Sequence, residues 1–322
     1  MNIRPRRNRK SAAIRALVEE TKIGPENLIY PIFLKDGVKI KEEVSTLPNN
    51  FRWSVDMLLP EIEQCLNLGI KSFDIFPVVD EHLKDAIASY SYAADNFYLK
   101  AISEIKKRFP EVILMSDVAL DPYSSDGHDG LVEKGEILND ETLPILARMS
   151  LAQAHAGIDI IGPSDMMDGR VGFIREHLDA HGFTDVSIMS YTAKYASAFY
   201  GPFRDALNSA PKSGDKKTYQ MNPANKREAL LEAELDFSEG ADMLMVKPAM
   251  CYLDIIAMLK DNFNIPITAY NVSGECAMIH FAAKNGILNY EQAVHETLIS
   301  MRRAGADAIL TYFAKDFASF IK

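Results

Sequence analysis

Short apolar runs alternate with longer amphipathic stretches along most of the chain, starting near Asn27. The short runs have the length and the β-branched content of buried strands, whereas the longer stretches repeat apolar residues at helical spacing. Eight strands are predicted, at Leu28–Phe33, Ser72–Phe76, Val112–Asp117, Ile158–Gly162, Ser187–Tyr191, Met243–Lys247, Ile267–Tyr270 and Ala308–Tyr312. Helices are predicted at Met57–Leu68, Asn96–Arg108, Glu141–Ala156, Val171–His181, Asn225–Ser238, Tyr252–Phe263 and Tyr290–Ala304.

This alternation predicts an α/β fold with parallel strands and helical crossovers. Eight such units predict a (β/α)8 TIM barrel over residues 25–322. Gly157, Gly240 and Gly305 each stand just before a predicted strand, and we expect them to end helices in the left-handed conformation. A doubly wound sheet is the alternative, but no GxGxxG turn follows the first strand.

Residues 1–24 differ from the rest of the chain. Five basic residues crowd the first ten positions, and a short helix is predicted within Ala12–Glu20. One interpretation is a solvated, partly disordered tail. The other is an extended N-terminal arm that packs on the acidic surface of a neighbouring subunit.

Composition and charge argue against several classes of protein. A net charge of −10 argues against a general nucleic-acid binder, and no apolar run is long enough to span a membrane. The basic amino end has no apolar segment after it, so a secretory signal is not expected. The three cysteines lie far apart and predict no disulfide framework, which favours a reducing, cytoplasmic location.

Two lysines stand at the carboxyl ends of neighbouring predicted strands, where barrel enzymes place their chemistry. Lys247 ends an apolar strand directly before Pro248, and Lys194 follows the preceding strand. Two ammonium groups held close together in an apolar setting repel, so at least one is expected to become a neutral amine, which attacks ketones to form a Schiff base. The structural alternative is two lysines that merely pair with Asp117 and Asp165.

A long polar stretch follows Lys194. Its Phe199, Tyr200 and Phe203 could close over a site as a lid, while Arg204 and Lys216 could clamp a carboxylate. An ordinary disordered surface loop is the alternative.

The stretch from Asp117 to Gly130 is rich in aspartate. It contains Asp121, Asp126 and Asp129 together with His128, and it offers oxygen ligands that suit Mg²⁺. Loops rich in Asp and Gly are also ordinary turns, so the spacing leaves both interpretations open.

These motifs together resemble the porphobilinogen synthase family, also called 5-aminolevulinate dehydratases, which act in tetrapyrrole biosynthesis. The resemblance covers nearly the whole chain. It rests on Arg4–Arg7, Asp117–Tyr123, Asp126–Gly130, Pro163–Arg170, Met189–Lys194, Phe199–Arg204, Met245–Pro248 and Tyr270–Glu275, in this order.

The resemblance implies a lyase that condenses two molecules of 5-aminolevulinate into porphobilinogen with loss of two waters. Members of the family bind their two substrates at two positions, called the A side and the P side. The family's Schiff-base lysines correspond to Lys247 at the A side and to Lys194 at the P side. The family's other substrate contacts fall on Arg204, Lys216 and Gln220 at the A-side carboxylate, on Ser273 and Tyr312 at the P-side carboxylate, and on Ser164, Asp165 and Asp117 in the P-side pocket.

The resemblance also implies a metal and an assembly. Zinc-type members carry three cysteines where this chain has Ala119, Asp121 and Asp129, so the chain looks like the magnesium-responsive plant and bacterial type. Asp121 and Asp129 are candidate ligands, although Ala119 offers none. An allosteric Mg²⁺ is expected at Glu232, linked to a subunit contact near Asp168 and Arg170, in a homo-octamer.

Two other functions remain open at this stage. A class I aldolase with a single Schiff-base lysine would need a phosphate site of backbone amides after the seventh and eighth strands, and Val272–Gly274 resembles one weakly. A catalytically silent barrel that serves as an oligomeric scaffold would have little reason to keep both lysines beside an aromatic lid.

Overall fold

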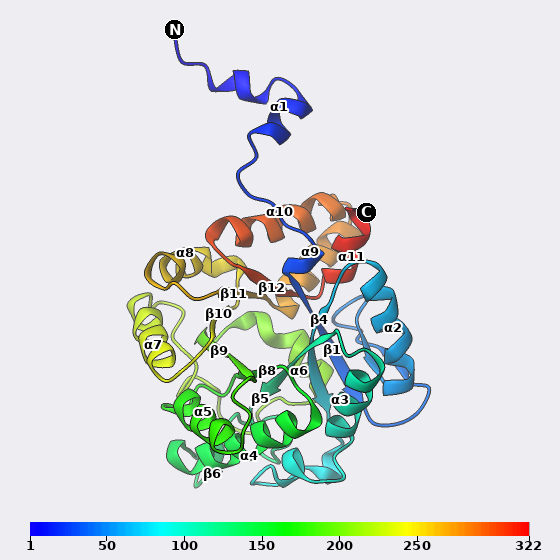
Figure 1. Ribbon diagram of the computed structural model, residues 1–322, viewed down its shortest axis with the longest axis vertical. Helices are drawn as coiled ribbons and strands as arrows, with labels where there is room; N and C mark the ends of the chain where they lie inside the picture. Colours follow the sequence, from blue (N-terminus) through cyan, green and yellow to red (C-terminus); the bar gives the residue numbers. More distant parts are fainter. Residues whose placement is uncertain (322) are drawn as a thin grey trace.

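The computed structural model describes residues 1–321. Its centre is a closed barrel of eight parallel strands, in which consecutive strands pair and Leu28 of the first pairs with Ile309 of the last. The predicted (β/α)8 TIM barrel is therefore confirmed (Figure 1). The barrel strands are β1 (Leu28–Lys35), β4 (Ser72–Val78), β5 (Ile113–Val118), β8 (Ile160–Pro163), β9 (Ser187–Lys194), β10 (Met243–Lys247), β11 (Ile267–Asn271) and β12 (Ala308–Thr311).

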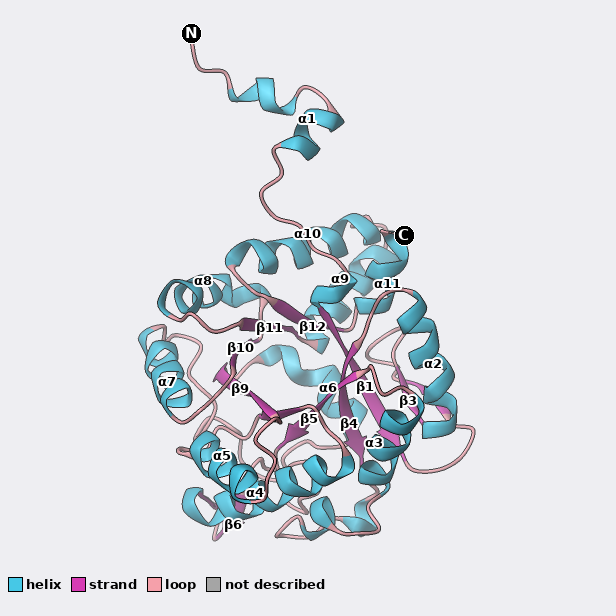
Figure 2. Cartoon of the chain, viewed as in Figure 1, coloured by secondary structure: helices cyan, strands magenta, loops and turns pink. Residues whose placement is uncertain are grey.

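Helices surround this barrel (Figure 2). Every helix predicted between the strands is present within a few residues of its expected bounds, as α2 (Val55–Asn67), α3 (Phe97–Arg108), α4 (Asn139–Ala156), α5 (Arg170–Ala180), α7 (Arg227–Ser238), α8 (Leu253–Asn262) and α10 (Tyr290–Ala304). Three were not predicted, namely α6 (Gly201–Leu207), α9 (Ser273–Lys284) and α11 (Ala314–Phe320). The first two begin among Gly, Pro and Ser residues that the sequence suggests are loop.

Small elements decorate the loops. Two short strand pairs, β2 (Lys41–Glu43) with β3 (Phe51–Trp53) and β6 (Leu131–Glu133) with β7 (Glu136–Leu138), were also not predicted. The 3-10 turns are η1 (Pro5–Arg9), η2 (Pro25–Asn27), η3 (Glu81–Leu83), η4 (Ser89–Tyr92), η5 (Ala198–Tyr200) and η6 (Met250–Tyr252).

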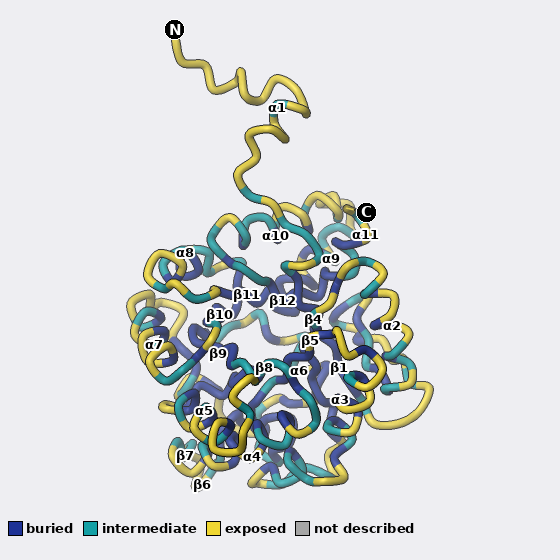
Figure 3. The backbone as a smooth tube through the Cα atoms, in the orientation of Figure 1, coloured by how far each residue is buried: buried dark blue, intermediate teal, exposed yellow. Residues whose placement is uncertain are grey.

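The amino-terminal segment extends away from the barrel (Figure 1). It contains η1 and α1 (Ala12–Leu17), and neither has a buried residue, so the segment is coloured as exposed almost throughout in Figure 3. This shape agrees with the predicted arm of residues 1–24, whose contact with another subunit stays a prediction. Across residues 1–321, no helix combines the length and the apolar character that crossing a membrane requires.

The three glycines expected at helix ends do have positive φ angles. Gly157, Gly240 and Gly305 have φ angles of 103°, 101° and 121°. Gly157 caps α4 in the left-handed conformation, where a side chain would be strained. These caps set where each helix turns back into the barrel.

We predict that Gly157→Ala lowers the free energy of unfolding by about 1 kcal/mol, because alanine resists positive φ. Equilibrium urea unfolding measures this. Gly201→Ala is the matched control: Gly201 is in the right-handed helical region, and no heavy atom lies within 4 Å of the position its Cβ would take. An equal loss of stability in both variants would contradict the explanation.

Candidate active site

A small pocket of about 30 Å³ lies where the carboxyl ends of the barrel strands meet the segment after β9. It brings together eight of the residues singled out from the sequence, with Tyr200 and Phe203 of the predicted lid. The lining residues are Asp117, Asp121, Ser164, Lys194, Tyr200, Phe203, Arg204, Lys216, Gln220 and Lys247.

The two lysines are direct neighbours across the sheet. Lys247 of β10 pairs in register with Lys194 of β9, and each residue is 6% exposed. Each ends a strand whose preceding residues are buried, so the side chains enter the barrel mouth from adjacent positions. The predicted juxtaposition of the two amines is thus present in the fold.

Lys247 is enclosed by aromatic rings. Its Nζ lies 4.4 Å from the ring centre of Tyr270 and 4.8 Å from that of Tyr191, with Phe203 of the lid at 5.1 Å. Burial lowers the pKa of Lys247 to about 7, and the positive charge of Lys194 adds to this effect. Near neutral pH a large share of this amine is therefore unprotonated and nucleophilic.

Lys194 has a different environment. Its Nζ donates to Asp129 Oδ2 at 3.0 Å and also to the backbone carbonyl of Ser164. Asp129 accepts from Lys216 as well, at 2.5 Å, and Lys216 reaches Asp121 at 3.2 Å. These two cations lower the pKa of the Asp129 carboxyl although burial opposes them. Lys194 is ion-paired, with Asp129 rather than with Asp117 or Asp165.

Asp117 and Ser164 face the lysines, but Asp165 does not. The hydroxyl of Ser164 donates to Asp117 at 2.8 Å, and burial raises the pKa of Asp117 to about 6 although both lysines oppose the shift. Asp165 instead lies 3.8 Å from the buried guanidinium of Arg170. Neighbouring residues of an extended segment point to opposite sides, so Ser164 lines the pocket and Asp165 lies behind it.

The predicted lid covers the pocket as η5 and α6. The hydroxyl of Tyr200 donates to the backbone carbonyls of Tyr195 and Lys247, at 2.7 and 3.2 Å. Phe203 packs edge-on against Phe76 of the barrel, with ring centres 5.0 Å apart. Arg204, on the same helix, lines the pocket. The stretch after Lys194 is therefore a structured cover in this conformation.

The start of α9 packs against the lid, but neither Ser273 nor Tyr312 is among the residues that line the pocket. Ser273 Oγ accepts from the backbone amide of Phe203 at 3.0 Å, and the hydroxyls of Tyr312 and Tyr270 lie 3.0 Å apart. The amide of Val272 donates to Glu275 at 3.0 Å. Glu275 thus already occupies one of the backbone amides that a phosphate site at Val272–Gly274 would need.

Asp121 and Asp129 do not fit a resident active-site cation. Their carboxylates converge on the ammonium of Lys216, and Asp129 also binds Lys194. Ala119 offers no ligand, and no group of three or more His, Cys, Asp or Glu residues within the described chain is arranged to hold a metal. This arrangement argues against the ion expected there, because two lysines supply the positive charge instead.

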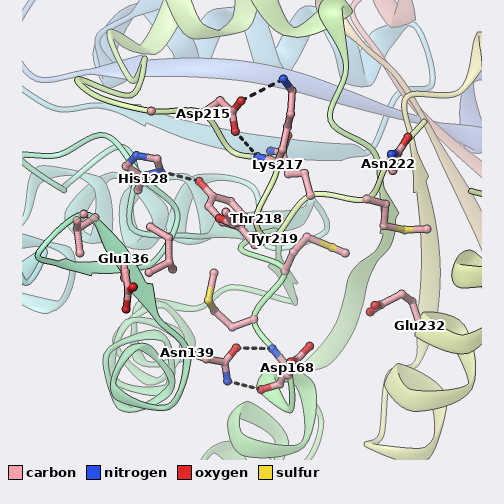
Figure 4. Close-up of a pocket in the computed structure, with 18 of the residues that line it drawn as sticks. His128, Glu136, Asn139, Asp168, Asp215, Lys217, Thr218, Tyr219, Asn222 and Glu232 are labelled. Atoms are coloured by element: carbon pink, nitrogen blue, oxygen red, sulfur yellow. Dashed lines mark hydrogen bonds and ion pairs between the residues drawn. The ribbon is translucent and has the colours of Figure 1, made fainter. Parts of the chain in front are cut away.

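Glu232 lines a separate and larger cavity, of about 1000 Å³. In Figure 4 its carboxylate points into the open space across from Asp168, which exchanges two hydrogen bonds with Asn139. Burial raises the pKa of Glu232 to about 7, and repulsion by three acidic neighbours adds to it. One carboxylate in a polar cavity suits an ion that keeps most of its water, as Mg²⁺ does.

Arg170 is only 2% exposed. It pairs with Asp236 at 3.4 Å and donates to Ser190 Oγ at 3.1 Å. In this conformation it cannot itself touch another subunit, so only the exposed Asp168 is left for the expected contact.

Sequence reasoning missed two features of the site. Tyr191 and Tyr270 contact Lys247 on two sides, but in the sequence they look like ordinary strand residues. Asp74 is fully buried beneath them, and its hydrogen bond comes from Tyr191 at 3.3 Å. A single acidic residue inside the apolar run Phe73–Val79 was the signal that could have drawn attention to it.

Comparisons with known proteins agree on one family. The family model for delta-aminolevulinic acid dehydratase matches residues 2–320. A delta-aminolevulinic acid dehydratase of Chlamydia pneumoniae is 54% identical over 311 residues, covering 97% of this chain and 94% of that protein. A chloroplastic relative from Physcomitrium patens is 53% identical over 324 residues, covering 100% and 74%.

A solved structure agrees with them. The delta-aminolevulinic acid dehydratase (porphobilinogen synthase) of Toxoplasma gondii ME49, in complex with the reaction product porphobilinogen, superposes with a TM-score of 0.98. Its sequence is 51% identical, and the match covers 99% of this chain and 92% of that one.

We predict that the reactivity of Lys247 depends on pH with a midpoint near 7. A lysine with a lowered pKa is an ammonium below that pH and an amine above it, so acylation by acetic anhydride should rise about tenfold from pH 6 to pH 8 and then level off. Competitive labelling followed by peptide mass spectrometry measures it.

The control is Lys194→Met, which removes the neighbouring positive charge and should move the midpoint upward. A labelling rate at Lys247 that keeps rising above pH 9 in the unmodified protein would show an ordinary, hydrated lysine.

Proposed function

The chain belongs to the delta-aminolevulinic acid dehydratase family, and on this basis we propose that it condenses two molecules of 5-aminolevulinate into porphobilinogen through Schiff bases on Lys247 and Lys194. The observation that carries the proposal is the pair of adjacent buried lysines, one ion-paired and one enclosed by aromatic rings. A silent scaffold would have no use for a lysine amine held without a carboxylate hydrogen bond.

Lys247 is the first nucleophile in this proposal. Its neutral amine attacks the ketone carbon of one substrate, and loss of water gives an iminium. A proton is then lost from the adjacent carbon, because the cationic nitrogen draws electrons, and the enamine that results attacks the second bound carbonyl. The aromatic enclosure keeps water away from the imine carbon, which protects it from hydrolysis.

Lys194 holds the second substrate. An amine must lose its ammonium proton before it adds to a ketone, and Asp129 Oδ2, 3.0 Å from Nζ, is the carboxylate placed to take that proton. Lys216 keeps Asp129 in its carboxylate form, which can accept a proton, although the same ion pair weakens Asp129 as a base.

The remaining polar residues hold the substrates by their charged ends. Arg204, Lys216 and Gln220 would bind one substrate carboxylate as donors, Gln220 through its side-chain amide N–H. Ser273 and Tyr312 would bind the other carboxylate through their hydroxyls. Asp117 with Ser164 would hold the amino group of the P-side substrate. Asp165 has no direct part, because it faces Arg170.

Substrate entry requires the lid to move. A cavity of about 30 Å³ has room for a single water, far less than two keto acids need. We therefore infer that η5 and α6 swing away from Lys247 and close again after binding, which brings Arg204 onto the substrate carboxylate.

We predict that borohydride traps a covalent adduct of 5-aminolevulinate on Lys247, and that Lys247→Met abolishes both this adduct and formation of the pyrrole. Activity should fall at least about 10⁴-fold, since a covalent nucleophile is lost. Mass spectrometry locates the adduct, and a colour reaction for the pyrrole reports turnover.

Lys217→Met is the matched control, because Lys217 is an exposed lysine on the same segment as Lys216. Full turnover by Lys247→Met, or an adduct only on lysines outside the pocket, would reject the proposed chemistry.

We further propose a magnesium-responsive, cytoplasmic homo-octamer. A hydrated Mg²⁺ at Glu232 would offset the repulsion among the acidic residues of that cavity, and the exposed, basic arm could then pack on an acidic neighbour. The ion would act on assembly, and no step of the condensation runs through it.

We predict that Mg²⁺ increases the assembled fraction and that Glu232→Ala removes this response. Gel filtration with and without chelator measures it. The pKa of Glu232 is raised to about 7, so the carboxylate that binds the ion is lost as pH falls through 7, and the response should weaken below that pH.

Glu136→Ala removes an equal charge from the opposite wall of the cavity and serves as control. Identical elution and an identical magnesium response in the Glu232 variant and the unmodified protein would refute the site.

A further inference from the structure

Strand β4 carries a carboxyl group into the barrel interior beneath the lysine pocket. Asp74 and Phe76 are two residues apart and therefore point to the same face of the strand. Phe76 contacts Phe33 and Phe203 in the barrel mouth, with ring centres 6.2 and 5.0 Å apart. Asp74 thus lies one layer below, and it is 0% exposed.

This carboxyl group has little to stabilise a negative charge. Its hydrogen bond within residues 1–321 comes from the hydroxyl of Tyr191 to Oδ2 at 3.3 Å, and Oδ1 has no partner there. An ionised carboxylate so buried and so poorly paired is strongly disfavoured. Burial, with repulsion from Asp117, raises the pKa of Asp74 well above its ordinary value, and Lys247 opposes this only in part. Burial and the scarcity of partners therefore favour the protonated form of Asp74 while Lys247 is uncharged.

Tyr191 connects Asp74 to the nucleophile. The Nζ of Lys247 lies 4.8 Å from the centre of the Tyr191 ring, and the hydroxyl of the same ring binds Asp74. A positive charge fixed on that nitrogen therefore acts on Asp74 across one side chain in a dry interior.

The other titratable groups around Asp74 come from five elements. They are Asp117 of β5, Lys247 of β10, Tyr270 of β11, Tyr312 of β12 and Tyr98 of α3. Burial raises the pKa of each tyrosine well above its ordinary value, so the tyrosines stay neutral. Asp117 hydrogen-bonds Ser164. Burial raises the pKa of Asp117 only to about 6, so Asp117 is already mostly ionised at pH 8, and Asp74 is the carboxyl group of this cluster left to lose a proton.

We propose that Asp74 is the internal counter-charge of the imine on Lys247: it keeps its proton while Lys247 is a free amine and releases it when the nitrogen becomes a cationic iminium. The inference rests on the proposed function, because it requires an iminium at Lys247. Asp74 makes no contact with the reacting atoms, so it is a positioning residue that acts through charge.

The chemistry balances without any further reactant. The neutral amine adds to the ketone, a C–N bond forms, and the carbinolamine that results is neutral. Its hydroxyl leaves as water when it receives one proton, the C–O bond breaks, and the nitrogen becomes positive. Asp74 does not touch that hydroxyl, which takes its proton from solvent. As the positive charge forms, Asp74 gives up one proton, so the proton taken up and the proton released cancel. The interior then gains one positive and one negative charge, and no net charge is buried.

The test counts protons. The probe is 4-oxopentanoate, the substrate without its amino group, which can form the imine but cannot complete a pyrrole. It is mixed with the protein at pH 8, where Lys247 is mostly an amine, in a weakly buffered indicator solution, and borohydride trapping with mass spectrometry counts the Lys247 adducts.

Asp74→Asn keeps the shape of the side chain and the acceptor for Tyr191 but cannot ionise. We expect it to take up about one more proton per Lys247 adduct than the unmodified protein, and to form the adduct roughly tenfold or more slowly, because the iminium charge is then buried without a counter-charge. Tyr191→Phe removes the hydrogen bond and leaves the carboxyl group, so its proton count should match the unmodified protein.

Equal proton counts in the Asp74 variant and the unmodified protein, with adducts present in both, overturn the inference alone. A changed count in Tyr191→Phe equal to that of Asp74→Asn also overturns it, because the hydrogen bond would then be responsible. If the unmodified protein forms no Lys247 adduct, the proposed function fails and the inference fails with it.

A second measurement, infrared difference spectroscopy, uses only the unmodified protein. It therefore tests the proposal even if Asp74→Asn does not fold. Binding of 4-oxopentanoate should remove the carbonyl stretch of one protonated carboxylic acid. A spectrum in which that band persists contradicts the proposal.

Discussion

The exclusion of water from one amine is the constraint on which the rest of the site depends. An ammonium group at Lys247 would lie among the rings of Tyr270, Tyr191 and Phe203, with no carboxylate hydrogen-bonded to it in the described residues. Aromatic faces attract a cation only modestly, whereas the loss of hydration on burial disfavours the charged form more strongly, and the neighbouring Lys194 makes it less favourable still. The fold makes Lys247 nucleophilic near neutral pH because it gives the ammonium form neither water nor, within the described residues, a carboxylate partner.

The asymmetry between the two lysines follows from what each can reach. Lys194 reaches Asp129, which it shares with Lys216, whereas Lys247 reaches aromatic faces. Lys194 and Lys247 occupy matched positions on adjacent strands, but Lys194 starts the reaction in an ion pair and Lys247 starts it among aromatic rings. This difference suits a condensation of two ketones, because one bound substrate must become the nucleophilic enamine and the other must remain the electrophile that the enamine attacks.

The barrel and its lysines could be predicted from the sequence because both follow from local pattern. Strand period, glycine caps and a lysine before Pro248 are properties of short segments. The pairing of Asp129 with two lysines could not be predicted, since it depends on how the loop after β5 folds back over the pocket. Ser164 and Asp165 are neighbours in sequence and were both expected in the pocket, yet only Ser164 lines it. Asp74 was overlooked because a buried, poorly paired acid contradicts the usual preference of strands.

The central claim is that Lys247 loses its proton near neutral pH, far below the pH at which an ordinary lysine does so. Heteronuclear NMR of ¹⁵N-lysine protein, with the resonance assigned by Lys247→Met, follows the protonation of its Nζ directly. We expect a titration midpoint of about 7 for Lys247. A midpoint near the ordinary lysine value of 10.5 would contradict the account.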